Sequence, residues 1–187
     1  MHSFPHRIPL AALSLPPIVP HQSLSATPSR ILFIDVDGVL NRCNWEEGDS
    51  RAALHQECVR QLNRILAATK AGLVITSNWR EWIEEGAMTL EGFEFMLRTH
   101  EVVGGRVVGV TASDEDVQGR GAQVAAWLAK HPHVRALAIL DDESEWPEPA
   151  AQRRRLMHVK GKKGLTCATA NHAMRLLKTP LQKRPKR

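Results

Sequence analysis

The chain has 187 residues, 43% of them hydrophobic and 24% charged, which is typical of a soluble globular protein with one sizeable core. No apolar run approaches the ~20 residues of a membrane-spanning helix, and three cysteines without metal-type spacing favour a reducing compartment. We therefore expect a cytoplasmic protein. The net charge of +5 is uneven, because residues 151–187 carry 12 basic side chains and no acidic one. This part either attracts polyanions or serves as a solvated tail.

The two ends of the chain have a different composition from the middle. Residues 1–29 contain six prolines among serines and histidines and no acidic residue, which indicates a disordered leader. A secretory signal is disfavoured, because prolines interrupt the apolar part and the positive N-terminal region is weak. We expect one α/β domain at residues 30–178, followed by a basic, proline-containing tail at 179–187.

The first predicted strand, Ile31–Ile34, is followed by Asp-Val-Asp-Gly at residues 35–38. Four consecutive apolar residues are typical of a strand buried on both faces, as in a parallel sheet. Ligands bind beyond the carboxyl ends of such strands, where Asp35 and Asp37 would lie. Two neighbouring acids repel each other, and a hard cation such as Mg²⁺ would offset this repulsion. A calcium loop of the EF-hand type is disfavoured, since a strand precedes the acids and Val39 occupies a ligand position.

A helix and a second strand are predicted next. Apolar residues at helical spacing indicate a helix at about Arg51–Thr69, for which Ser50 would be a suitable N-cap. The strand Gly72–Ile75 then ends in Thr76 and Ser77. A hydroxyl at this position can donate to a phosphoryl oxygen, and the start of the next helix offers backbone N–H groups. Alternatively, Ser77 simply caps that helix.

Two helices, at about 79–86 and 90–100, and a short strand at 106–111 are predicted before the next candidate residue. We assign the large apolar side chains of these helices to the core rather than to a ligand site: Trp82, Ile83, Phe93, Met96 and Leu97. A polar, acidic loop then leads to a helix that begins at Arg120. A cation at a helix N-terminus opposes the helix dipole, so this arginine is easier to explain if an anion binds there. The alternative is an ordinary surface arginine.

The last predicted strand, Val134–Leu140, ends in Asp141 and Asp142. An acidic cluster is often a solvated loop, but this is the third apolar strand that ends in residues suited to phosphate or metal chemistry. A short apolar stretch, Leu156–Val159, follows. A closing helix is predicted after Thr166, its N-cap, and ends at about residue 178.

In their order, these motifs resemble those of the haloacid dehalogenase (HAD) superfamily. The sequences DVDGVLN at 35–41, TSNWR at 76–80, RGA at 120–122, LDDE at 140–143 and GLT at 164–166 narrow the resemblance to the small HAD domain of Swiss Army Knife RNA repair proteins. The resemblance implies a three-layer, Rossmann-like α/β fold with a central parallel sheet and a minimal cap. A small cap leaves an open mouth, which suits a bulky substrate such as a polynucleotide end.

The resemblance also implies residue roles. Asp35 would be the nucleophile that attacks phosphorus, and Asp37 the general acid and base. Arg120 would bind the phosphoryl group together with a hydroxyl, for which Thr76 matches the family motif better than Ser77 does.

The same resemblance implies a Mg²⁺ site. Its predicted ligands are Asp35, the backbone carbonyl of Asp37, and the acidic pair Asp141 and Asp142. Asp142 would bind directly, through water, or by orienting a ligand.

The sequence thus predicts a Mg²⁺-dependent phosphohydrolase that works through an aspartyl-phosphate, with phosphorylated RNA ends as the preferred substrate and no membrane partner. The second aspartate, Asp37, argues against a dehalogenase. The alternatives are a phosphatase of small metabolites and a non-catalytic, polyanion-binding protein with the same fold. The oligomeric state is left open.

Overall fold

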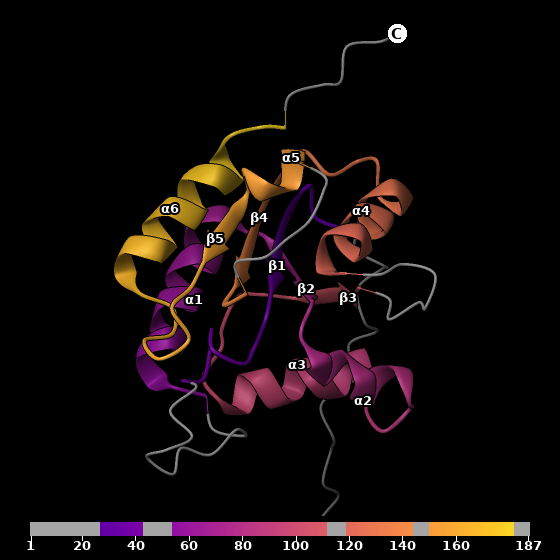
Figure 1. The fold of residues 1–187 in the computed structure, drawn as a ribbon. Coiled ribbons are helices and arrows are strands. Elements are labelled where there is room, and N and C mark those ends of the chain that lie inside the picture. Colours follow the sequence, from indigo (N-terminus) through magenta and orange to yellow (C-terminus); the bar gives the residue numbers. More distant parts are fainter. Residues whose placement is uncertain (1–26, 43–53, 112–118, 144–149, 182–187) are drawn as a thin grey trace, which may run out of the picture.

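The computed structural model describes residues 27–42, 54–111, 119–143 and 150–181 (Figure 1). Most of the predicted leader, the end of the predicted tail and the predicted cap Ser50 lie outside these residues. Within them, five parallel strands form one sheet in the order β3-β2-β1-β4-β5. The strands are β1 (Arg30–Ile34), β2 (Gly72–Ile75), β3 (Val107–Val110), β4 (Ala136–Asp141) and β5 (Leu156–His158). The predicted α/β fold with a central parallel sheet is confirmed.

Helices cover both faces of this sheet, as the predicted three-layer arrangement requires. Helices α1 and α6 lie together on one face, and α4 lies on the other (Figure 1). The helical segments are α1 (Gln56–Thr69), the 3₁₀ turn η2 (Asn78–Arg80), α2 (Glu81–Glu84), α3 (Leu90–Thr99), α4 (Arg120–Lys130), α5 (Ala150–Arg153) and α6 (Cys167–Lys178). No helix among the described residues is long and apolar enough to cross a membrane.

The side chains of β1 alternate between two apolar cores, because successive residues of a strand point to opposite faces. Leu32 and Ile34 belong to the core under α1 and α6. Ile31 and Phe33 belong to the core under α4. There the rings of Phe33 and Trp127 pack edge to face, with their centroids 5.4 Å apart. The same alternation places the next residue on this side, Asp35, on the α4 side of the sheet just beyond the end of the strand.

The segment between β2 and β3 contains only η2, α2 and α3, so it adds no separate cap domain there. Phe93 and Leu97 of α3 are buried in the core shared with α1 and α6, as predicted. The assignment of Trp82 to the core is wrong, because this side chain is 42% exposed. Helix α2 has one turn, and only part of so short a helix can face the core.

The ends of the described domain lie beside the start of β4. The carbonyl oxygen of Ser29 accepts hydrogen bonds from the backbone N–H groups of Arg135 and Ala136, at 2.7 and 3.2 Å. The N–H of Leu181 donates in turn to the carbonyl oxygen of Arg135 at 2.7 Å. Residues at both edges of the predicted domain therefore add to its hydrogen bonding.

Candidate active site

Three aspartates from two neighbouring strands meet at the carboxyl edge of the sheet. Strands β1 and β4 are paired in register up to Ile34 and Leu140, so Asp35 and Asp141 leave the sheet side by side. One carboxylate oxygen of Asp35, one of Asp141 and one of Asp142 all lie within 4.8 Å of one another. Asp35 is 2% exposed and Asp141 is fully buried. Buried carboxylates this close together require a compensating positive charge.

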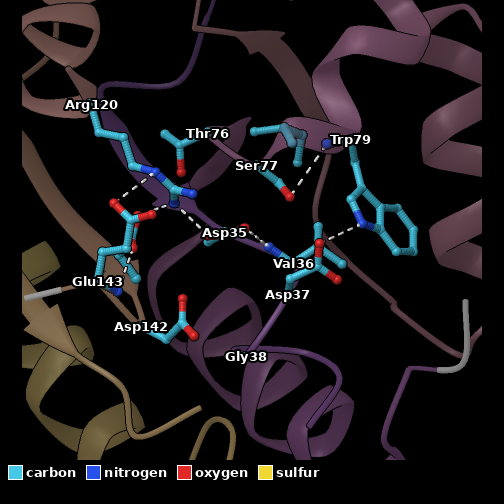
Figure 2. Close-up of polar contacts among 12 residues, drawn as sticks. Asp35, Val36, Asp37, Gly38, Thr76, Ser77, Trp79, Arg120, Asp142 and Glu143 are labelled. Atoms are coloured by element: carbon cyan, nitrogen blue, oxygen red, sulfur yellow. Dashed lines mark hydrogen bonds and ion pairs between the residues drawn. The ribbon is translucent and has the colours of Figure 1, made fainter. Parts of the chain in front are cut away.

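Arg120, the first residue of α4, supplies part of that charge (Figure 2). Its Nη1 donates to Oδ2 of Asp35 and, at 2.6 Å, to Oδ2 of Asp141. Its Nε lies 3.5 Å from Oε2 of Glu143. The position of Arg120 at a helix N-terminus is therefore explained by its ion pairs with carboxylates of the protein itself.

The electrostatics of this cluster favour a further cation. Burial raises the pKa of Asp141 to about 7, and the attraction of Arg120 offsets only part of this rise. Burial, followed by repulsion from Asp35, also raises the pKa of Asp142. Burial opposes the charge on Arg120, but the neighbouring carboxylates outweigh it and raise the arginine pKa.

Asp35, Asp141 and Asp142 together carry a formal charge of −3 when ionised and the Arg120 guanidinium carries +1, so −2 remains before the exposed Glu143 is counted. A divalent cation would neutralise it, and carboxylate oxygens are the ligands that Mg²⁺ prefers. The donor set therefore fits a magnesium ion held by Asp35, Asp141 and Asp142.

The carboxylate of Asp37 belongs to a separate group of hydrogen bonds. Its Oδ2 accepts from Nε1 of Trp79 at 3.1 Å (Figure 2). Its Oδ1 accepts from Nδ2 of Asn41 at 2.7 Å. Oδ1 of Asn41 in turn accepts from the backbone N–H of Gly38 at 2.9 Å, which closes the turn. Asn41 and Trp79 thus hold Asp37 in one orientation, a role that the sequence analysis missed although both lie within its motifs.

Gly38 brings this turn against the carboxylate of Asp142, one of the three clustered aspartates. Its φ of +69° lies in the left-handed region that favours glycine. A Cβ atom at this position would collide with Oδ2 of Asp142 and lie 2.5 Å from its Cγ. Glycine is therefore favoured here for two reasons: it adopts the positive φ of the turn, and it leaves room for the side chain of Asp142.

The two hydroxyl candidates at the end of β2 have different environments. The backbone N–H of Thr76 donates to the carbonyl oxygen of Ile34 at 3.0 Å, which places the residue beside Asp35. Thr76 is 1% exposed, and its hydroxyl has no hydrogen-bond partner among the described residues. Ser77 instead caps η2, because its Oγ accepts from the backbone N–H of Trp79 at 3.4 Å. Both hydroxyls can still donate to a ligand, but of the two only that of Thr76 is buried without a hydrogen-bond partner among the described residues.

The sheet is parallel, with acids at the ends of β1 and β4, a hydroxyl after β2 and an arginine at the start of α4. Together these features define a HAD-type domain. The model of the family described as the HAD domain in Swiss Army Knife RNA repair proteins matches residues 31–170, more than half of the chain, and the protein belongs to this family. Membership implies a hydrolase, typically a phosphatase. No curated protein and no solved structure gives a significant match.

Proposed function

We propose that this protein is a Mg²⁺-dependent phosphatase that removes terminal phosphate groups from RNA ends through an aspartyl-phosphate on Asp35. The observation that carries the proposal is the meeting of Asp35, Asp141 and Asp142 around Arg120 at the carboxyl edge of the sheet. Bound Mg²⁺ would neutralise negative charge on the phosphoryl oxygens. Nucleophilic attack and proton transfer are assigned to residues of the chain itself.

Asp35 is the nucleophile in this mechanism. One of its carboxylate oxygens bonds to phosphorus while the bond between phosphorus and the ribose oxygen breaks. Its Oδ1 accepts from the backbone N–H of Val36 at 2.6 Å, and its Oδ2 accepts from Arg120, so the carboxylate has a fixed orientation. The unpartnered hydroxyl of Thr76 donates to an oxygen of the phosphoryl group as charge develops there.

Asp37 moves the protons. Its carboxyl group protonates the leaving ribose oxygen and then accepts a proton from the water that hydrolyses the aspartyl-phosphate. Asn41 and Trp79 hold this group close to the cluster without making it part of the cluster. Two acids two residues apart thus have separate roles because they have separate hydrogen-bond partners.

Two features support RNA ends as the substrate class. The matched family is described by its occurrence in RNA repair proteins. The segment between β2 and β3 adds only short helices, so no large cap between these strands restricts the substrate to a small metabolite.

The test compares phosphate release from oligoribonucleotides with a 5′- or 3′-phosphate, from sugar phosphates and from p-nitrophenyl phosphate. We expect activity with Mg²⁺, its loss in EDTA, and the highest kcat/KM on one of the RNA ends. Asp35→Asn keeps the shape of the side chain but removes the nucleophile, and we expect it to abolish turnover. Full activity of this variant would refute the mechanism, and faster turnover of a sugar phosphate would refute the RNA substrate.

A further inference from the structure

A cleft lies next to the turn that contains Asp37. It has a volume of about 370 Å³ and lies between the start of α1 and the loop that joins β5 to α6, a loop that lies beside α1 in Figure 1. Its polar lining comes from Arg42, Glu57, Lys162, Lys163, Thr166 and Cys167. This volume is in the range of small-ligand sites, so it exceeds what a single phosphate group requires.

The cleft is joined to the active site through the backbone. The N–H of Leu165, in the loop before α6, donates to the carbonyl oxygen of Val39 at 2.9 Å. Val39 belongs to the turn that contains Asp37. Arg42, on the wall of the cleft, directly follows Asn41, which holds the carboxylate of Asp37. A molecule in the cleft would therefore contact residues that adjoin or support the turn on which the proposed general acid lies.

The charge of the cleft is strongly positive. Arg42, Lys162 and Lys163 face one acid, Glu57, whose Oε2 is already paired with Nη1 of Arg60 at 2.9 Å. Lys162 and Lys163 are exposed and form no ion pair within the described residues.

The first turn of α6 adds the partial positive charge of a helix N-terminus to the cleft. The neighbouring catalytic cluster is acidic. A polyanion that reaches this cluster therefore needs a cationic surface next to it.

We propose that this cleft binds the sugar-phosphate backbone of the polynucleotide next to its terminal phosphate. Arg42, Lys162 and Lys163 pair with phosphodiester groups while the terminal phosphate lies at Asp35. This assignment rests on the proposed function and deepens it, because it explains how one open site selects a polynucleotide over a small phosphate ester. Of the two alternatives left open for residues 151–187, polyanion binding is thereby assigned to two of their lysines, Lys162 and Lys163.

The test removes two charges from the cleft by the double substitution Lys162→Gln, Lys163→Gln. The matched control, Arg175→Gln, Lys178→Gln, makes the same change of charge on exposed residues near the other end of α6, about 10 Å or more away along the helix. Binding of a fluorescent, end-phosphorylated oligoribonucleotide is measured by anisotropy over a range of salt concentrations. All proteins carry Asp35→Asn to prevent turnover.

For single strands, log K changes with log salt by about 0.7 per phosphate contact. Loss of two contacts should therefore reduce the slope by about 1.4 and the affinity at 0.1 M salt by roughly 25-fold. With Asp35 restored, the ratio of kcat/KM for the oligonucleotide to that for p-nitrophenyl phosphate should fall by a similar factor. The control pair should alter the slope and the ratio little.

An unchanged slope in the cleft variant, or an equal loss in the control, would overturn the assignment. Competition by an acidic peptide as effective as that by the oligonucleotide would also overturn it. Because anisotropy requires no turnover, the cleft is tested even if the protein hydrolyses none of the phosphate esters. Failure of the proposed function is thus distinguishable from failure of the cleft assignment.

Discussion

Replacement of Gly38 by alanine tests whether the turn after β1 leaves the space that Asp142 needs at the proposed magnesium site. The new Cβ would lie 2.5 Å from Cγ and 2.9 Å from Cβ of Asp142, closer than such atoms approach in proteins. The aspartate would have to move, and its carboxylate would leave the oxygen cluster with Asp35. We expect magnesium affinity to fall by roughly 10–100-fold, as happens when the support of a ligand is lost. This corresponds to about 1.4–2.8 kcal/mol.

The assay is isothermal titration with Mg²⁺ together with urea unfolding. The positive φ of +69° adds a backbone cost of about 1–2 kcal/mol for a residue with a side chain. Gly86→Ala is the matched control, because its φ is +74° but no atom lies within 4 Å of its Cβ position. The control should lose similar stability and keep its magnesium affinity.

A double-mutant cycle completes this test. In an Asp142→Gly background the carboxyl atoms and the Cβ of residue 142 are both absent, so Gly38→Ala should cause little further loss of magnesium affinity. An equally large loss in that background, or normal magnesium binding by Gly38→Ala alone, would refute the reasoning.

Two further predictions concern Thr76 and Trp79. Thr76→Val removes a buried hydroxyl without a partner among the described residues, so thermal unfolding should show no loss of stability. Its kcat/KM should nevertheless fall about 100-fold, because one hydrogen-bond donor to the transition state is lost. A destabilised but fully active variant would contradict the proposed role of Thr76 as that donor. Trp79→Phe removes the indole N–H that orients Asp37, and loss of a charge-assisted hydrogen bond should lower kcat roughly 10–100-fold. Trp82→Phe, which changes the neighbouring exposed ring, is the control, and an equal effect of both substitutions would argue against a specific role of the N–H.

The parts of the fold that were predicted correctly have local causes. Strands β1, β2 and β4 follow from uninterrupted apolar runs, which are typical of a buried parallel sheet. The start of α6 follows from capping chemistry, since Oγ1 of Thr166 accepts from the backbone N–H of Thr169 at 3.3 Å. In each case the determining residues lie within a few positions of one another.

The parts that were missed depend on contacts distant in sequence. Helix α1 begins at Gln56 rather than near residue 51, and the N–H of His55 bonds to the carbonyl oxygen of Leu40 at 2.8 Å just before it. Strand β5, predicted only as an apolar stretch, has three residues and depends on its pairing with β4. The indole of Trp79 reaches Asp37 across 42 positions. Local patterns hold no signal for such contacts.

The position of α6 has a consequence for the protein during translation. This helix packs on α1 and β4, and the loop before it bonds to Val39 in the catalytic turn. When synthesis has reached Asp142, all the aspartates of the site are present in the nascent chain. The apolar surface that α6 covers in the folded protein is then still exposed to water. The nascent chain acquires a closed core and a supported first turn only when residues 160–178 emerge. The candidate site thus gains this support only after all of its aspartates have been made.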